Sequence, residues 1–569
     1  MARSRFGVVD TAVALVSIGA ASCSTAAEVN PQLITPRAMR PLATIDERFL
    51  SYNVEMAEVI GGNFWRPYTP ESIAAMQAHA PSQDGQSGGA SADVAGQNQS
   101  MFQARPPIDL SNARLRTLAS ALGPAYMRTS GTWANSVYFH DSDTPPPAKP
   151  PNGFQGVLTR GEWKSVVKFA QAVGAKLVTS FAIGAGVRDA DGVWTPDQAR
   201  KFVVYTRSVG GDITSAEFFN EPNMPVYGGA PSGYSAQDYA RDFAIFRGFA
   251  EADAPDMAIA GPGSVGEAVL QPRMPEGARA VFLSTDAMLS ASPPPKYDLF
   301  SYHFYGAASI RCASKGANVQ ITPEEALSED WLARADTSYD FYVRELRDRY
   351  EPGKAVWITE TADAACGGNP WAATFLDTFR FLDQLGRLAK QEVSVVFHNT
   401  LASSEYGLLD QNSFEPRSNY WAALLWRRFM GSTVLDAGPL ESQLHLYAHC
   451  WRGHPGGVTL LAINLSRTET KSLELPNSAD RYTLSAPVGH GDAPVLSEVV
   501  ETPRSQDRMP CCAIPLALTP ATVPYRASGL VVWVISDGTM KESATEAALF
   551  RSCLRLAWRA KSRSTPAFP

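Results

Sequence analysis

Eight short runs rich in β-branched and aromatic residues recur between residues 45 and 430, and segments with helical spacing of apolar residues separate them. Strands that alternate with helices in this way form a parallel sheet, because each helix returns the chain to the edge where the next strand begins. Eight such units predict a closed (β/α)8 barrel, also called a TIM barrel. The runs begin at Phe49, Ala125, Lys176, Ile213, Met257, Tyr297, Ala355 and Val393.

The pattern changes after residue 430. Segments such as LHLYAHCW, GVTLLAINLS and GLVVWVIS alternate with a period of two, which predicts a C-terminal antiparallel β-sandwich over residues 431–540. A chain of 569 residues with 45% hydrophobic residues is long enough for both cores. We expect the sandwich to pack on the barrel; independent sugar binding is the alternative.

Two segments fit neither core. Residues 80–104 are rich in Gly, Ser and Gln and are expected to form a flexible insertion in the barrel. Residues 541–569 are interpreted as a C-terminal appendage with one basic amphipathic helix, either frayed or bound to a membrane surface.

Residues 1–27 have the layout of a secretory signal, with Arg3 and Arg5 before an apolar stretch and then small residues. The AASC sequence that ends at Cys23 leaves a lipoprotein signal as the alternative. We therefore expect a secreted or extracytoplasmic protein, with or without a lipid anchor at Cys23. No other segment approaches the ~18 apolar residues of a membrane span.

Charge and cysteine content exclude several classes of function. The net charge is −7 and basic residues do not cluster, which disfavours nucleic acid as a partner. The seven cysteines have no CxxC spacing and predict neither a disulfide framework nor a zinc site. We expect mostly free thiols.

Glu221 ends the fourth run and Glu360 lies at the end of the seventh. In a closed barrel these strand ends face each other across the mouth, so the two carboxylates can approach across one cleft. Such a pair suits glycoside hydrolysis by double displacement, in which one group attacks the anomeric carbon and the other protonates the leaving oxygen. The alternative is that each Glu is a surface carboxylate or a structural hydrogen-bond acceptor.

Several motifs resemble the heparanase and β-glucuronidase family of retaining glycosidases. They are FFNEPN, VWITETADAACGG, FSYHFYG, YWAALLWRRFMGSTVL, TLLAINLS and VPYRASGLVVWVI, in the order of that family. The resemblance spans about residues 45–537 and implies the same barrel-and-sandwich architecture.

The resemblance also implies roles for individual residues. Glu221 corresponds to the acid/base and Glu360 to the nucleophile. Asn220 would bind the sugar 2-hydroxyl, and Arg128 would lie beside Glu360 and hold it ionised. A purely structural salt bridge is the alternative for Arg128.

Further residues are expected to contact the substrate. Tyr305 could donate a hydrogen bond to the nucleophile, whereas His303, on the same strand face, is either part of the site or a core histidine. A glycine loop and a tyrosine are implied to bind the substrate carboxylate; a structural turn is the alternative for the glycines. These positions are Gly367, Gly368 and Tyr406, next to Cys366, and the other expected substrate contacts are Thr132 and Asn399.

Two positions depart from the heparanase pattern. The first run carries Glu55-Met56-Ala57 where the family has Asp-x-Asn, and Asn399 stands where it has Gln. These changes are expected to alter contacts to sugar hydroxyls without affecting the double displacement.

The resemblance favours a secreted, retaining β-glucuronidase that removes terminal glucuronic acid from glycans or glycosides, with no metal or organic cofactor. An endo-β-glucuronidase that cleaves heparan-type chains is the alternative, although it would need a cleft flanked by Lys and Arg for sulfates. A non-catalytic carbohydrate-binding protein is a third reading, but it predicts the loss of one carboxylate, and both are present. The oligomeric state stays open.

Overall fold

The computed structural model describes residues 32–78, 101–466, 471–474, 479–485, 495–499, 513–516 and 530–535. The expected signal (1–27), the appendage (541–569) and most of the expected insertion lie outside the described residues. None of the helices in the described part combines the length and apolar character that crossing a bilayer requires.

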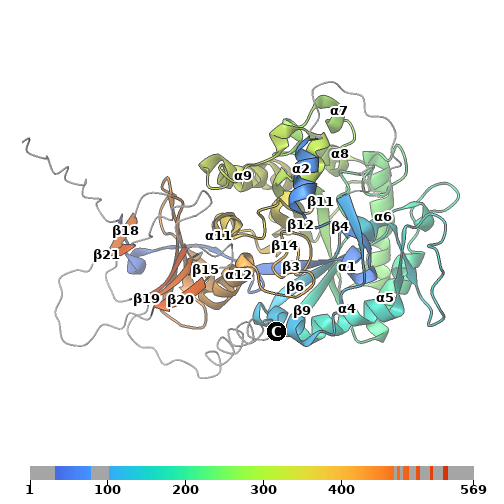
Figure 1. Ribbon diagram of the computed structural model, residues 1–569. Helices are drawn as coiled ribbons and strands as arrows, with labels where there is room; N and C mark the ends of the chain where they lie inside the picture. Colours follow the sequence, from blue (N-terminus) through green and yellow to red (C-terminus); the bar gives the residue numbers. More distant parts are fainter. Residues whose placement is uncertain are drawn as a thin grey trace, which may run out of the picture.

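Within the described residues, eight parallel strands close into a barrel in the order β10-β11-β12-β13-β14-β3-β6-β9 (Figure 1). Each predicted run contributes one strand, which confirms the (β/α)8 prediction. The strands are β3 (Leu50–Glu55), β6 (Ala125–Ser130), β9 (Ala175–Ser180), β10 (Ile213–Glu217), β11 (Ala258–Val265), β12 (Leu299–Ala308), β13 (Val356–Ala365) and β14 (Val395–His398).

The helices that cover the barrel begin and end where the local sequence favours it. In α4 (Arg160–Val173), Thr159 and Glu162 form a capping box, and the helix ends at Gly174, whose φ of 68° suits a residue without a Cβ. Its Trp163 is fully buried. The other long helices are α2 (Pro70–Ala78), α3 (Ala113–Ala121), α5 (Asp197–Ser208), α6 (Ala236–Asp253), α9 (Glu329–Tyr339), α11 (Phe375–Lys390) and α12 (Ser418–Phe429). Shorter helices are α1 (Met56–Ile60), α7 (Glu276–Arg279), α8 (Thr285–Ser290) and α10 (Asp348–Tyr350).

Two small strand pairs stand outside the barrel. The hairpin of β4 (Gly62–Trp65) and β5 (Phe102–Arg105) is antiparallel, and β7 (Val137–His140) pairs with β8 (Gly156–Thr159) in parallel. The expectation of a flexible loop up to residue 104 is therefore wrong at its C-terminal end. Phe102 is the reason, because its buried ring packs on Trp65 with 4.8 Å between ring centroids.

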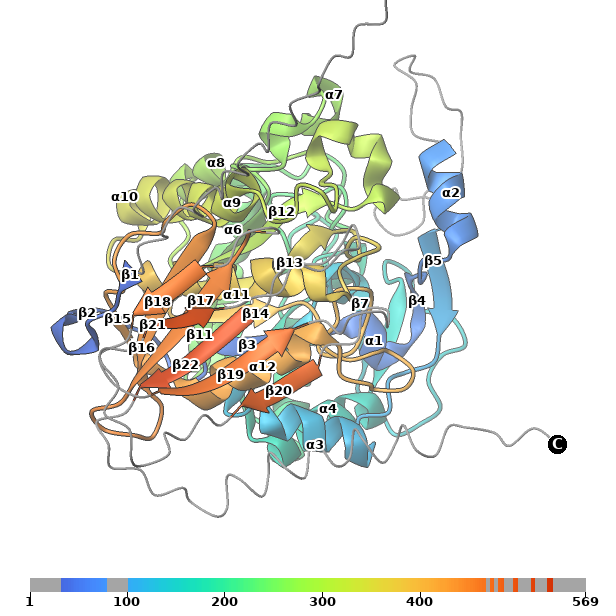
Figure 2. The same cartoon turned by 60° about the vertical axis from the view of Figure 1, so that its left-hand side comes forward.

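The second unit is a β-sandwich beside the barrel (Figure 2). A seven-stranded sheet has the order β2-β15-β16-β17-β22-β19-β20, and a smaller sheet has the order β1-β18-β21. Leu446 and Leu460 of the larger sheet pack with Leu473 of the smaller one in a single apolar core. The strands are β1 (Gln32–Leu33), β2 (Pro41–Thr44), β15 (Met430–Leu435), β16 (Leu444–Trp451), β17 (Val458–Asn464), β18 (Lys471–Glu474), β19 (Ala479–Ser485), β20 (Val495–Val499), β21 (Ala513–Leu516) and β22 (Leu530–Ile535).

The sandwich includes residues from before the barrel. β1 pairs with β18, and β2 pairs with β15, where Ala43 faces Val434. The sandwich therefore includes strands outside the predicted range of residues 431–540, since the chain enters the barrel from the sandwich and returns to it.

Candidate active site

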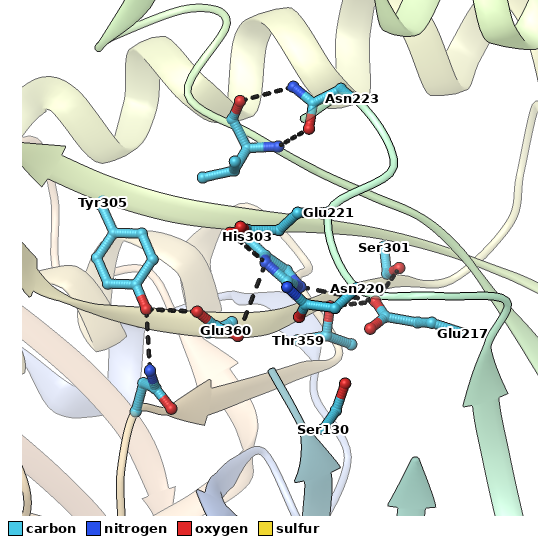
Figure 3. Close-up of polar contacts among 12 residues, drawn as sticks. Ser130, Glu217, Asn220, Glu221, Asn223, Ser301, His303, Tyr305, Thr359 and Glu360 are labelled. Atoms are coloured by element: carbon cyan, nitrogen blue, oxygen red, sulfur yellow. Dashed lines mark hydrogen bonds and ion pairs between the residues drawn. The ribbon is translucent and has the colours of Figure 1, made fainter. Parts of the chain in front are cut away.

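The two carboxylates predicted to face each other meet at the barrel mouth (Figure 3). One carboxylate oxygen of Glu221 lies within 4.8 Å of one of Glu360. Neither residue ends its strand as expected: β10 stops at Glu217, so Glu221 lies in the following turn, and β13 continues past Glu360 to Ala365. Both are largely buried, at 9% and 7% exposure, and line one cavity.

Asparagine side chains hold the backbone on both sides of Glu221. Asn135, in the 3₁₀ turn after β6, accepts a hydrogen bond from the N–H of Asn220 at 2.8 Å and donates one to its carbonyl at 2.9 Å. Asn223 makes the same pair of bonds with Val265, at 2.8 and 3.0 Å. Glu221 itself has a left-handed φ of 51°, which costs free energy for a residue with a side chain. The two amide clamps hold this turn and so fix the direction of the carboxylate.

Donors hold both oxygens of Glu360. Arg128 donates from Nη1 to Oε2 at 3.0 Å, and the Tyr305 hydroxyl donates to Oε1 at 2.6 Å. Arg128 also donates from Nη2 to Oδ1 of Asn220 at 2.7 Å, and Asn399 donates to the Tyr305 oxygen at 3.0 Å. These bonds orient the carboxylate of Glu360 and place a positive charge beside it.

Arg128 also forms a buried ion pair with Glu217. It therefore has the structural role that was the alternative in addition to its contact with Glu360. Its Nε and Nη2 lie 3.0 and 2.8 Å from Oε2 of Glu217, while Ser301 and Thr359 donate to Oε1 at 2.8 and 2.6 Å. Burial alone would raise the pKa of Glu217, but Arg128, His303 and Thr359 hold that pKa well below its ordinary value. The guanidinium of Arg128 therefore bridges the carboxylates of Glu217 and Glu360.

His303 is fully buried among the acidic groups. Its Nδ1 lies 3.1 Å from Oε1 of Glu221 and its Nε2 lies 3.8 Å from Oε1 of Glu217. Burial alone would lower the pKa of His303, but the carboxylates of Glu360, Glu217 and Glu221 raise it to about 9. Burial and the charge of Glu360 raise the pKa of Glu221, although His303 opposes them. Glu221 therefore keeps its proton to higher pH than an ordinary glutamate, as a general acid must.

Glu221, His303 and Glu360 also form a cluster whose possible metal-ligand atoms lie within 4.8 Å of one another. A His303 side chain with a pKa of about 9 is protonated near neutral pH. A protonated imidazole has no lone pair for a metal, because ligating histidine must be neutral. Arg128 and Tyr305 also occupy both oxygens of Glu360, so the cluster fits acid–base chemistry better than metal binding.

A cavity of about 910 Å³, counting the solvent at its mouth, lies over the carboxylates. Six residues of the predicted site line it: Glu221, Glu360, Thr132, Tyr305, Asn399 and Tyr406. Arg128, Asn220 and His303 are almost fully buried beside the carboxylates and do not line the cavity. Gly367 and Gly368 do not line it either, but they follow Cys366, which does.

Glu55, at the end of β3, brings a third carboxylate to the cavity. Its side chain lies so close to Gly131 that a Cβ there would be 1.6 Å from Oε2 of Glu55. Burial and the charge of Glu360 raise the pKa of Glu55 well above its ordinary value. Glu55 stands where the heparanase pattern has Asp, and its longer side chain fits because Gly131 has no side chain.

Two glycines shape the loop after β13. Gly367 and Gly368 have φ of 80° and 83°, which residues with a side chain rarely adopt. A Cβ at Gly367 would lie 2.6 Å from the ring of Trp65, and one at Gly368 would lie 3.0 Å from the ring of Tyr406. The loop can pass between the two aromatic side chains because it carries no side chains there.

Arg311, which belongs to none of the sequence motifs, holds this loop in place. Its fully buried guanidinium donates from Nη1 to the carbonyls of Cys366 and Gly368, both at 3.2 Å. Its Nη2 lies 2.6 Å from Oε2 of Glu405, and its guanidinium stacks 3.7 Å from the ring centroid of Tyr68. The Tyr68 hydroxyl also donates to Gly368, at 3.0 Å.

A disulfide joins Cys312 to Cys366 beside Arg311. The expectation of mostly free thiols is wrong for this pair. The two cysteines are 54 residues apart in sequence, but they follow β12 and β13, which are neighbours in the barrel, so their loops meet. Cys450 is free, and the other cysteines lie outside the described residues.

Sequence comparison finds relatives among the heparanases. The chain is 27% identical to heparanase-like protein 1 of Arabidopsis thaliana over 394 residues, which cover 65% of this chain and 67% of the relative. It is 29% identical to the heparanase of Bos taurus over 435 residues, with coverages of 66% and 74%. These matches confirm the resemblance to heparanases. No protein-family model matches the chain.

Solved structures share the fold at low sequence identity. An arabinofuranosidase from Xanthomonas axonopodis pv. citri superposes with a TM-score of 0.55 at 14% identity and covers 87% of this chain and 98% of its own. A 4-O-α-L-rhamnosyl-β-D-glucuronidase from Fusarium oxysporum gives a TM-score of 0.52 at 14% identity, with coverages of 89% and 100%. At this identity the likeness establishes the fold alone. The heparanase relatives and the paired carboxylates together support a glycoside hydrolase.

Proposed function

We propose that this heparanase-like chain is a retaining β-glucuronidase that removes terminal glucuronic acid from glycans or glycosides. The observation that carries the proposal is the short separation of the two carboxylates, whose nearest oxygens lie within 4.8 Å. Retaining enzymes hold their carboxyl groups ~5–5.5 Å apart, whereas inverting enzymes need roughly 6.5–9.5 Å to admit a water molecule between sugar and base.

Glu360 is the proposed nucleophile and Glu221 the proposed acid/base. A Glu360 oxygen attacks the anomeric carbon as the bond from this carbon to the leaving oxygen breaks, and Glu221 gives its proton to that oxygen. The ionised Glu221 then takes a proton from water, whose oxygen attacks the same carbon and releases Glu360. The raised pKa of Glu221 supports its role as the proton donor.

The uronic acid preference rests on the loop after β13. Backbone N–H groups near Gly367 and Gly368, with the Tyr406 hydroxyl, are proposed to bind the substrate carboxylate. Tyr406 lines the cavity, and its hydroxyl accepts a hydrogen bond from Asn399 at 3.2 Å. Asn220 is proposed to bind the sugar 2-hydroxyl. Thr132 is proposed to contact the substrate, since it lines the cavity.

A secreted or extracytoplasmic location is part of the proposal. The disulfide between Cys312 and Cys366 supports it, because disulfides persist in oxidising compartments and are rare in the cytosol.

Endo-cleavage of heparan-type chains is the second candidate, and the names of the relatives favour it. It predicts that large oligosaccharides are released from heparan sulfate, whereas the exo reading predicts free glucuronic acid alone. Size-exclusion chromatography of the digest separates the two.

The decisive test compares hydrolysis of an aryl β-glucuronide with that of the matching glucoside and xyloside, by the wild type and Glu360→Gln. We expect turnover of the glucuronide only and a loss of about 10⁴-fold or more in kcat for the variant. Equal activity on the neutral sugars would reject the uronic acid preference, and full turnover by Glu360→Gln would reject the nucleophile.

A further inference from the structure

One half of the cavity is apolar and lies next to the acid/base. Two loops form it, the turn after Glu221 and the segment after β11. Its apolar residues are Met224, Tyr227, Val265, Leu270, Met274 and Phe282. Around Glu360 the lining residues include Tyr305, Asn399 and Tyr406, which are polar at their tips. The remaining apolar lining residues include Trp65 and Trp133.

Asn223 fixes the apolar half to the acid/base. Its side chain is bonded to the backbone of Val265 in both directions, and its carbonyl accepts the N–H of Leu283 at 2.8 Å. Both loops are thus tied to a residue two positions from Glu221 (Figure 3). The apolar wall therefore keeps a constant position relative to the carboxylate that protonates the leaving oxygen.

The position of Glu221 determines which half of the substrate meets this wall. A general acid lies beside the oxygen between the sugar and the leaving group, while the nucleophile lies under the sugar ring. Since the apolar side chains adjoin Glu221 and the polar ones adjoin Glu360, the leaving group meets the apolar half.

The charge of the cavity points the same way. Glu55, Glu221 and Glu360 line it, and among the described residues none of its lining side chains is Lys or Arg. Arg128 and Arg311 lie nearby, but both are fully buried and bonded to carboxylates. A sulfated leaving group would enter an apolar pocket whose lining offers no cation to pair with its charge, which costs free energy.

We propose, on the basis of the β-glucuronidase function above, that this enzyme takes glucuronides whose leaving group is a bulky apolar, preferably aromatic, alcohol. The apolar half of the cavity is its leaving-group site. A sulfated saccharide binds poorly in this leaving-group site, because the pocket neither neutralises its charge nor forms hydrogen bonds with its hydroxyls.

Binding of uncleaved analogues tests this without interference from leaving-group reactivity. We would measure inhibition constants for 2-naphthyl and methyl 1-thio-β-glucuronide in the wild type, in Met274→Gln, which keeps the shape of the side chain, and in Leu270→Asn. The naphthyl compound should bind at least about tenfold tighter to the wild type, and each variant should lose most of this ratio. Val204→Thr, on an exposed apolar residue of α5, should keep it.

A second arm compares hydrolysis of 2-naphthyl β-glucuronide with that of a glucuronyl-glucosamine disaccharide, with and without sulfate. Three results would each overturn the leaving-group proposal. The two thioglucuronides could inhibit the wild type equally, or the ratio of their inhibition constants could be unchanged in both variants. The sulfated disaccharide could also be hydrolysed faster than the naphthyl glucuronide. The glucuronidase proposal survives all three results and fails only if aryl glucuronide is not preferred over aryl glucoside.

Discussion

His303 controls the proton on Glu221. Its imidazole is 3.1 Å from the Glu221 carboxylate and lowers the pKa of Glu221 against the raising effects of burial and Glu360. In His303→Gln the pKa of Glu221 should rise, so the acid stays protonated to higher pH. The basic limb of the kcat/KM profile for an aryl glucuronide should therefore move to higher pH.

The control for this profile is His449→Gln, a buried histidine of the sandwich that bonds to the carbonyl of Gly431. It should leave the basic limb in place. A limb that moves to lower pH in His303→Gln would contradict the assignment of the limb to Glu221.

Arg311 is expected to determine how well the loop after β13 binds a carboxylate. A lysine cannot reproduce the forked bonds to Cys366, Gly368 and Glu405, so the backbone of the loop should lose its position in Arg311→Lys. The ratio of kcat/KM for aryl glucuronide over aryl glucoside should fall by at least about tenfold, mostly through KM.

Arg188→Lys is the matched control, since the Arg188 side chain is also almost buried, pairs with Asp242 at 2.8 Å and lies over the ring of Tyr234, away from the loop. It should lose stability without changing the substrate ratio. If both variants change the ratio alike, Arg311 has only a structural role.

Glu221 and Glu360 were predictable from the sequence because each follows a run of apolar residues in a distinctive motif. Glu217 could have been predicted as well, since it is a carboxylate inside the fourth apolar run, four residues before Glu221. Arg311 could not, because its partners come from loops up to 245 residues away, and nothing local distinguishes it from a surface arginine.

At the scale of elements, all eight barrel strands were predicted because fully buried parallel strands read as continuous apolar runs. Their ends were less predictable. β12 and β13 extend to Ala308 and Ala365 because they keep pairing with each other beyond the mouth. The role of β2 was not predictable, because Ala43 precedes the barrel in the sequence and its partner Val434 follows it.

The disulfide ties two neighbouring βα loops together, one after β12 and one after β13. The double variant Cys312→Ser, Cys366→Ser should lower the free energy of unfolding by up to about 4 kcal/mol, the chain-entropy value for a loop of this length. It should also raise KM for the glucuronide, because Cys366 begins the loop proposed to bind the carboxylate. Denaturant unfolding and steady-state kinetics measure the two effects.

Cys450→Ser controls for loss of a thiol, since Cys450 is free. It should change neither quantity. A double variant with unchanged KM would separate the disulfide from substrate binding and leave it a purely stabilising role.

At the scale of the whole molecule, the sandwich packs on α11 of the barrel, and the buried Asp383 of α11 lies at this contact. Its carboxylate accepts hydrogen bonds from Arg387 at 2.7 Å and from Tyr447 at 2.6 Å, and it contacts His445. A Cβ at Gly386 would lie 2.4 Å from the ring of Tyr447, so helix and sheet are in direct contact there. Asp383 thus joins a barrel helix to two residues of β16.

This junction gives the last prediction. Burial would raise the pKa of Asp383, but His445, Arg387 and Tyr447 lower it below the unfolded value, so its stabilisation is present above about pH 4 and is lost on acidification. Asp383→Asn should therefore cost about 3 kcal/mol of unfolding free energy at pH 7. The difference from the wild type should shrink as the pH falls below about 4 and the wild-type carboxylate takes up its proton. Asp336→Asn, which removes a partly exposed contact of the same Arg387, should cost less than about 1 kcal/mol at any pH. A deficit in Asp383→Asn that stays constant with pH would show that shape, not charge, joins the sandwich to the barrel.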